Sequence, residues 1–187
     1  MARVVVADYD GEWPKAFEQL RARIWPAVSD FALTIEHVGS TAVPGLVSKP
    51  VIDICVVVRS RDHTPLGIER LAQLGYVHRG DLGVPDREAF AGPEGPPRHH
   101  LYLSPQDSLS LKNHLALRDY LRAHPDSARA YGALKHRLAE EFPDDIDSYI
   151  EGKTDFILAI LRDLGFSPQE LAAIERINRR DSIVRPG

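Results

Sequence analysis

The sequence predicts an α/β protein whose first half, about residues 1–105, alternates strands with helices and whose second half, about 106–187, is all helical. Three observations predict this division. Residues 33–58 have the pattern strand, polar turn, strand, and the second of these strands is almost wholly β-branched, as in a strand buried on both faces. Residues 80–98 are rich in glycine and proline, and after Ser108 the apolar spacing is helical throughout. We find no long linker, so we expect a single domain over residues 1–187.

In the first half, apolar spacing and turn residues define each element. Phe17, Leu20, Ile24 and Val28 share one helical face, so a helix is expected over 13–28, with Pro26 kinking or ending it early. The expected strands cover residues 4–7, 33–38, 51–58, 76–79, 87–91 and 98–103, and a second helix covers 64–74.

The second half is divided into helices by proline and glycine. The first helix is expected over 109–123, and Asp126 is expected to cap the next, which Pro143 ends. A long helix capped by Asp145 or Asp147 then runs to Leu164. A capping box over 167–170 opens the last helix.

Composition excludes several functional classes. The chain has 23 basic and 27 acidic residues, a net charge of −4, so we expect no generic binding to nucleic acid. No apolar run is long enough to span a bilayer, so we expect no membrane partner. Cys55 is the only cysteine, which excludes an internal disulfide and favours a cytoplasmic protein.

Asp53 is the one charged residue in the apolar strand 51–58. A buried carboxylate is costly unless a metal, a cation or a hydrogen-bond network pairs with it. Gly39 and Ser40, with Thr41 beside them, follow the preceding strand, where free backbone N–H groups and a hydroxyl suit a phosphate. If the two strands are adjacent, this turn and Asp53 share one cleft.

Eight stretches of the sequence match the pattern of one known family. They are HVGSTAVPGL at 37–46, KPVIDI at 49–54, GDLGVP at 80–85, REAF at 87–90, HHLY at 99–102, HL at 114–115, RDYLR at 118–122 and YIEGK at 149–153. Through these stretches the chain resembles the GrpB family, within the nucleotidyltransferase superfamily, over nearly its whole length.

The resemblance implies a nucleotidyltransferase-like mixed β-sheet flanked by helices. Active members of the superfamily carry two carboxylates two residues apart on a strand, which hold divalent metals on the phosphates of a nucleotide. Here the second position is Cys55, and a neutral thiol is a poor ligand for Mg²⁺. We expect Cys55 to be a small core residue, and Glu36 and Glu88 are the acidic candidates to replace the missing ligand.

Histidines offer further ligands and a general base. His37, His99 and His100 lie on expected strands near Asp53, but His99 and His100 point to opposite faces. Our expectation names Asp53 and His100 as catalytic, and Asp53, His37 and Glu88 as metal ligands. The expected cofactor is Mg²⁺ or Mn²⁺, with Zn²⁺ as the alternative.

Basic residues are expected to bind the phosphates of a nucleotide or other phosphorylated small molecule. The candidates are Lys49, Arg87, Arg118 and Lys153, which also match the family pattern, whereas Arg122 is assigned to the solvated surface or to salt bridges with acidic residues. The function that follows is nucleotidyl or phosphoryl transfer. Two alternatives stay open: a ligand-binding module that has lost catalysis, favoured by Cys55, and a metal-dependent hydrolase built on histidine and aspartate.

Overall fold

The computed structural model describes residues 3–179 and contains one five-stranded sheet of order β1-β2-β5-β4-β3. The central pair β2 and β5 is parallel, and the other pairs are antiparallel, so the sheet is mixed. The strands are β1 Ala32–Val38, β2 Ile52–Val58, β3 Val77–His78, β4 Glu88–Ala91 and β5 His99–Pro105. Register places Val38 beside Asp53, and Asp53 beside His100.

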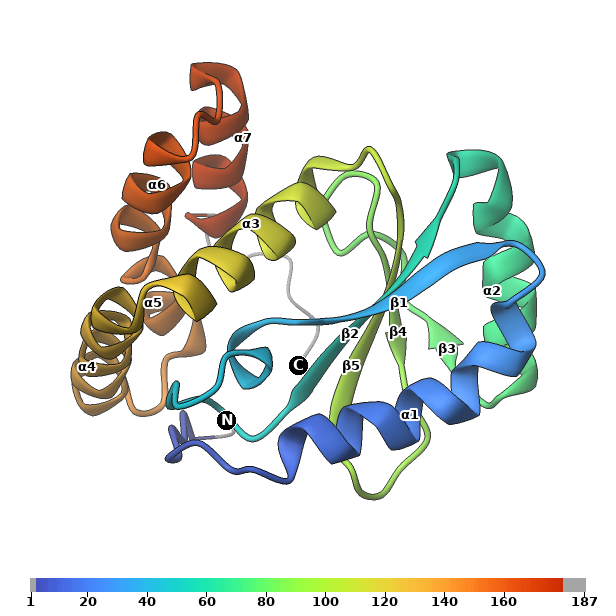
Figure 1. The fold of residues 1–187 in the computed structure, drawn as a ribbon, viewed down its shortest axis with the longest axis horizontal. Coiled ribbons are helices and arrows are strands. Elements are labelled where there is room, and N and C mark those ends of the chain that lie inside the picture. The colour runs from blue at the N-terminus through green and yellow to red at the C-terminus, as the bar shows by residue number, and fades with distance from the viewer. Residues whose placement is uncertain (1–2, 180–187) are drawn as a thin grey trace.

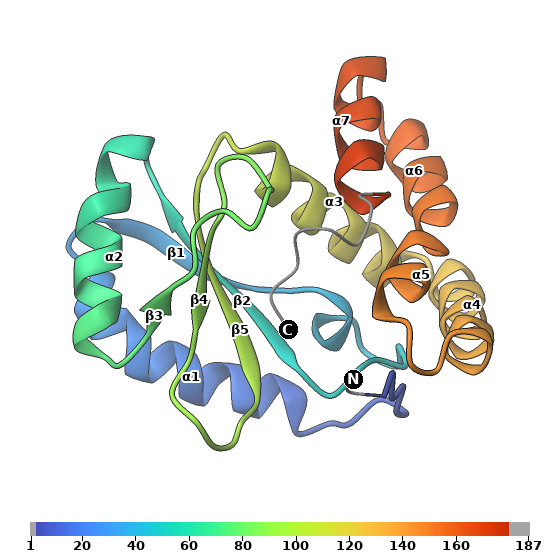
Figure 2. The ribbon, with the colours of Figure 1, turned by 180° about the vertical axis from the view of Figure 1, so that it is seen from behind.

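Seven α-helices and two short 3₁₀ turns complete the described part of the chain. The helices α1 and α2 pack on one face of the sheet, α3 crosses the other face, and α4 to α7 gather beside it (Figures 1 and 2). The bounds are α1 Trp13–Val28, η1 Ser40–Ala42, η2 Arg61–His63, α2 Thr64–Gln73, α3 Leu109–Ala123, α4 Pro125–Glu141, α5 Ile146–Glu151, α6 Thr154–Asp163 and α7 Pro168–Asn178.

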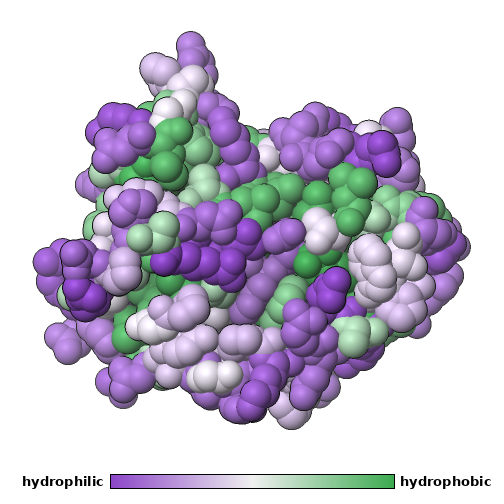
Figure 3. All heavy atoms as spheres, in the orientation of Figure 1, coloured by the Kyte–Doolittle hydropathy of each residue, from purple (hydrophilic) through white to green (hydrophobic). Residues whose placement is uncertain are grey.

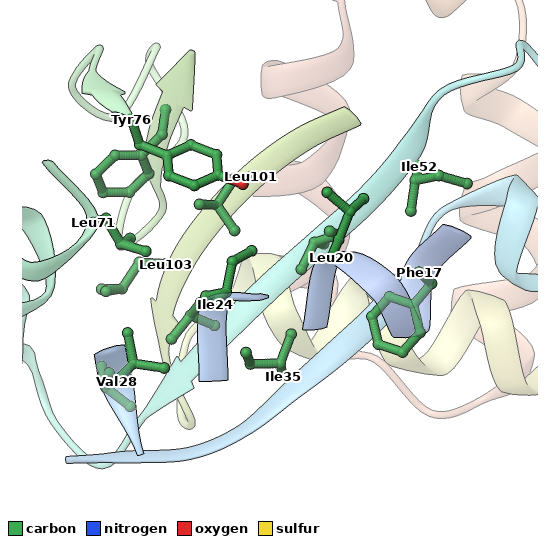
Figure 4. Packing of buried hydrophobic residues seen from close by; sticks show 14 of the residues in the cluster. Phe17, Leu20, Ile24, Val28, Ile35, Ile52, Leu71, Tyr76, Leu101 and Leu103 are labelled. Atoms are coloured by element: carbon green, nitrogen blue, oxygen red, sulfur yellow. The ribbon is translucent and has the colours of Figure 1, made fainter. Parts of the chain in front are cut away.

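The largest apolar cluster lies between α1, α2 and the sheet. Side chains of α1 point towards the strands, among them Leu20 and Ile24, and meet Leu101 and Leu103 of β5 (Figure 4). Because successive residues of a strand face opposite sides, Ile52 and Ile54 enter this cluster while Asp53 and Cys55 face α3. Burial of the apolar face fixes the register that sets Asp53 opposite it.

Most expected elements are confirmed, and the exceptions have local causes. Residues 4–7 do not form a strand: Ala7 makes an isolated bridge to Ser48, and Val4 donates to Pro143 O. Pro26 lies in the last turn of α1, and the helix continues past it to Val28, so Pro26 does not end the helix early.

In the second half, two helix boundaries were wrongly predicted. His124, not Asp126, occupies the N-cap of α4, because Pro125 takes the first helical position that suits its fixed φ. The long helix expected up to Leu164 is two helices, α5 and α6, divided at Gly152 and Lys153. A Cβ at residue 152 would overlap Leu138, so glycine there lets α5 approach α4 but weakens the helix.

The surface is mainly hydrophilic on the face shown in Figure 3, where apolar residues gather between α3 and the strands and, in a separate area, over α6 and α7. None of the helices within residues 3–179 has the length and apolarity needed to cross a membrane.

Candidate functional site

A cavity of about 360 Å³ lies where the start of β2 and β5 meets α3 and the helical half. We call it the first cavity. It brings together seven of the residues singled out from the sequence: Gly39, Ser40, Lys49, Asp53, His100, Arg118 and Lys153. Helices α3, α4 and α5 add Asn113, His114, Tyr131, Lys135 and Tyr149 to its wall.

Asp53 pairs with His100 from the neighbouring strand. Asp53 Oδ1 lies 3.0 Å from His100 Nδ1, and His100 is the more exposed of the two, with 51% of its side chain accessible. An ionised carboxylate only accepts hydrogen bonds, so Nδ1 carries the proton and donates it. His100 Nε2 is then free to accept a proton when the imidazole is neutral.

Gly39 allows the backbone to pass beside Asp53. Its φ is +73°, a conformation that L side chains rarely adopt, and a Cβ at this position would overlap Asp53 Oδ2. Both constraints require glycine, which explains why the turn between the two strands begins with this residue.

Helix α3 holds this turn through two arginines. Arg118 donates to Glu36 Oε2 at 2.8 Å, to His37 O at 3.0 Å and to Asp119 Oδ1 at 2.7 Å. Arg122 forms an expected salt bridge, to Asp119 at 3.9 Å, and also donates to Ala42 O at 2.9 Å, a backbone contact that was not predicted. Although Arg118 lines the first cavity, its guanidinium already has three acceptors, and we interpret it as positioning the turn.

Three lysines converge on the first cavity. Lys135 of α4 is only 2% exposed, and its Nζ lies 5.0 Å from the centre of the Tyr131 ring. Within residues 3–179 no carboxylate pairs with Lys135 or with Lys49. Burial, and then the charge of Lys153, lower the pKa of Lys135 to about 7, and burial lowers the pKa of Lys49. Lys153 lies 4.3 Å above the ring of Tyr149.

Four residues assigned to the site from the sequence lie outside the first cavity. His37 faces α1, where it stacks on Phe17 at 4.7 Å and contacts Thr41 Oγ1 at 3.0 Å. Thr41 is buried inside the turn and donates to Val51 O. Glu88 pairs with His78 at 2.6 Å on the outer strands, and Arg87 lines a second, smaller cavity.

Among residues 3–179, Asp53 has no second carboxylate beside it on β2 to help hold a metal ion. Cys55, at the second carboxylate position, is 2% exposed, and burial raises the pKa of its thiol to about 12. Tyr102 lies beside it on β5. In the described part of the chain no three His, Cys, Asp or Glu side chains are grouped to hold a metal ion. A lone Asp53 suits only a cation that is also held by the phosphates of a ligand.

Sequence reasoning missed Lys135, the most buried charged residue of the first cavity. A signal was present, since Lys135 falls on the same helical face as Tyr131 and Leu138, both expected to point inward. A lysine on an apolar helical face is a candidate ligand-binding residue. His99, by contrast, lies on the α1 side, where it contacts Tyr76 Oη and Pro97 O at 2.8 Å each.

Comparison with known proteins finds relatives along most of the chain. The family model described as GrpB protein matches residues 3–163. The UPF0157 protein YqkA of Bacillus subtilis (strain 168) is 34% identical over 155 residues, which cover 83% of this chain but only 45% of YqkA. The chain therefore spans less than half the length of that relative.

Solved structures agree with the family match. The conserved protein GrpB from Enterococcus faecalis is 32% identical, with a TM-score of 0.73 over 92% of this chain and 99% of that one. Terminal uridylyl transferase 4 from Trypanosoma brucei with bound UTP is 17% identical, with a TM-score of 0.50 over 96% of this chain and 59% of that one. At this identity the second similarity concerns the fold alone, which is nucleotidyltransferase-like.

Proposed function

The chain belongs to the GrpB family, and we propose that its first cavity binds a nucleotide or another phosphorylated small molecule and transfers a nucleotidyl or phosphoryl group. The observation that carries the proposal is Lys135, a buried lysine that lines the cavity and has no carboxylate partner among residues 3–179. Burying a charge without a partner is costly, so an anionic ligand is the natural partner for this amine.

The charge pattern of the cavity supports an anion with several charged oxygens. Lys49, Lys135 and Lys153 line the same space as Ser40, whereas Asp53 is engaged by His100. Compact ammonium groups suit phosphate oxygens as point charges. A polyphosphate carries charged oxygens along its length, so one molecule can contact more than one of these lysines.

We propose that a divalent cation, Mg²⁺ or Mn²⁺, enters with the ligand instead of residing in the protein. Asp53 is the residue that would hold it, together with phosphate oxygens and water, the usual way in which Mg²⁺ is bound beside phosphates. The cation would supply further neutralisation of phosphate charge. Because Cys55 is buried and neutral, we assign it no part in binding the cation.

His100 is the proposed general base. The proton of an attacking hydroxyl passes to His100 Nε2 while its oxygen forms the new bond to phosphorus. The bond from phosphorus to the leaving phosphate breaks with its electron pair on the departing oxygen, whose charge the lysines neutralise. Asp53 keeps the imidazole in the required tautomer through Nδ1.

A second candidate is a binding module without catalysis. The observation that favours it is Cys55, fully packed beside Val38 and Val57 where active superfamily members would carry a carboxylate. In this case the first cavity binds the same class of anion and no bond is broken.

Isothermal titration calorimetry with the four nucleoside triphosphates and with inorganic tripolyphosphate, each with Mg²⁺ or with EDTA, tests binding. We expect saturable binding that weakens at least about tenfold in Lys135→Met, equivalent to about 1.4 kcal/mol. The matched control is Lys15→Met, an exposed lysine of α1 paired with Glu12. No binding of any probe, or equal affinity of wild type and Lys135→Met, would contradict the proposal.

Turnover separates the two candidates. Incubation of the bound triphosphate followed by phosphorus NMR detects cleavage of a phosphoanhydride bond. Cleavage that is lost in His100→Gln, with binding retained, supports transferase chemistry. Binding without cleavage, and without dependence on His100, favours the binding module.

A further inference from the structure

A second cavity of about 140 Å³ adjoins the first, between the loop at 84–87, the start of α3 and the end of α7. We call it the second cavity. Asn113, His114 and Asn178 line both cavities, so the two are neighbours across one turn of α3. None of the lysines of the first cavity reaches the second.

Apolar atoms form most of the surface of the second cavity. Its apolar residues are Val84, Pro85, Leu109, Ala173, Ile174 and Ile177, and the other six residues that line it are Asp86, Arg87, Ser110, Asn113, His114 and Asn178. Asp86 also lines it, but Arg61 holds both of its carboxylate oxygens, at 2.6 and 2.7 Å. An apolar enclosure with a few polar atoms is typical of a site for the uncharged part of a small ligand.

Two buried polar atoms in this wall lack a hydrogen-bond partner among residues 3–179. They are Arg87 Nε, a donor, and Asn113 Oδ1, an acceptor. Leaving such atoms unpaired costs the free energy of removing them from water, so native proteins pair most of them. The guanidinium of Arg87 lies 4.5 Å above the ring of Tyr102, a residue of the first cavity, which fixes the donor at the junction.

We propose that the second cavity is a recognition subsite for a neutral planar group with a donor and an acceptor, a heterocyclic base, whose attached phosphates occupy the first cavity. This inference rests on the proposed function and specifies its ligand. Arg87 Nε donates to an acceptor of the base, and Asn113 Oδ1 accepts from a donor of the base. An anion offers only acceptors and would leave Asn113 Oδ1 unpaired, so the subsite favours a group that carries a donor as well as an acceptor.

Calorimetry with tripolyphosphate and the four nucleoside triphosphates, all with Mg²⁺, tests the subsite in the full chain. Two variants change it: Asn113→Leu removes the acceptor, and Ala173→Phe fills the cavity. The matched control is Ala172→Phe, on the same helix but exposed. Thermal unfolding of each variant checks that it folds.

We expect at least one nucleoside triphosphate to bind about tenfold or more tightly than tripolyphosphate. Ala173→Phe, at a residue that lines the second cavity alone, should remove this advantage and leave tripolyphosphate affinity unchanged. Asn113→Leu should also remove the advantage, and Ala172→Phe should change neither affinity. Asn113→Leu should also unfold at the same or a higher temperature, since it deletes a buried unpaired oxygen.

Two results would overturn the subsite while the proposed function stands. One is equal affinity for tripolyphosphate and every nucleotide, and the other is full nucleotide affinity in folded Ala173→Phe. If tripolyphosphate does not bind the wild type, the proposed function and the subsite are both overturned, because the subsite depends on the phosphate site of the first cavity.

Discussion

The two faces of β2 differ in chemistry although their residues alternate along one strand. Ile52, Ile54 and Val56 enter the apolar cluster with α1, and each is at most 2% exposed. On the opposite face, Asp53 opens onto the first cavity, followed by the buried Cys55.

This difference separates the residues that stabilise the fold from those available for binding. The α1 face gains its free energy from burying apolar surface, at about 25 cal/mol per Å². The α3 face leads to a buried lysine and to orphaned polar atoms, features that cost stability unless a ligand satisfies them. Substitutions on the two faces should therefore have opposite effects on stability and affinity.

The largest effect is expected from Ile54→Ala on the core face. Ile54 is 0% exposed, so the substitution leaves a cavity and should lower the free energy of unfolding by about 2–5 kcal/mol, measured by urea denaturation. Affinity for nucleotide well below the melting temperature should not change. The control is Val77→Ala, at a residue that is 54% exposed on the outermost strand. A binding defect in folded Ile54→Ala would show that the two faces do not have separate roles in stability and binding.

Gly39→Ala should disturb both stability and binding, because it strains the turn and pushes against Asp53. We expect a loss of roughly 1–3 kcal/mol in unfolding free energy and a weaker nucleotide complex by calorimetry. Gly45→Ala is the matched control: its φ is +78° but a Cβ there meets nothing within 4 Å. Equal binding defects in both variants would mean that the overlap with Asp53 is irrelevant.

Lys135→Met should raise stability while lowering affinity. The pKa of Lys135 is about 7 in the folded protein and 10.5 when unperturbed, so the unfolded chain binds more protons between these values. The resulting destabilisation of the wild type is complete below pH 7 and vanishes as pH rises towards 10.5. We expect a melting temperature higher by roughly 2–8 °C in Lys135→Met at pH 6, with the difference shrinking by pH 10. A pH-independent difference would contradict a titrating Lys135.

Much of this architecture was predictable because it depends on local pattern. The β-branched run at 51–58 and the helical spacing at 13–28 specify their elements and the core face, and alternation places Asp53 away from it. The turn at Gly39 and Ser40 was likewise placed beside Asp53, where both line the first cavity.

What the sequence did not give depends on contacts between distant segments. Lys135 enters the first cavity only because α4 packs across from the sheet, and Arg118 meets Glu36 only because α3 crosses β1. The break at Gly152 depends on Leu138 of another helix. The residue type identifies candidate binding residues in the sequence, but tertiary packing decides whether each one faces the ligand or another side chain.

Glu88→Gln, at the outer edge of the sheet, should have the smallest effect on stability and on nucleotide affinity. Glu88 pairs with His78 on β3, both side chains are partly exposed, and exposed pairs of this kind contribute about 0–1 kcal/mol. We therefore expect a change in unfolding free energy within this range and unchanged nucleotide affinity with Mg²⁺, whereas Asp53→Asn should weaken the Mg²⁺-dependent part. A tenfold loss of Mg²⁺-dependent affinity in Glu88→Gln would instead make Glu88 a metal ligand, which requires β4 to move towards Asp53 when the ligand binds.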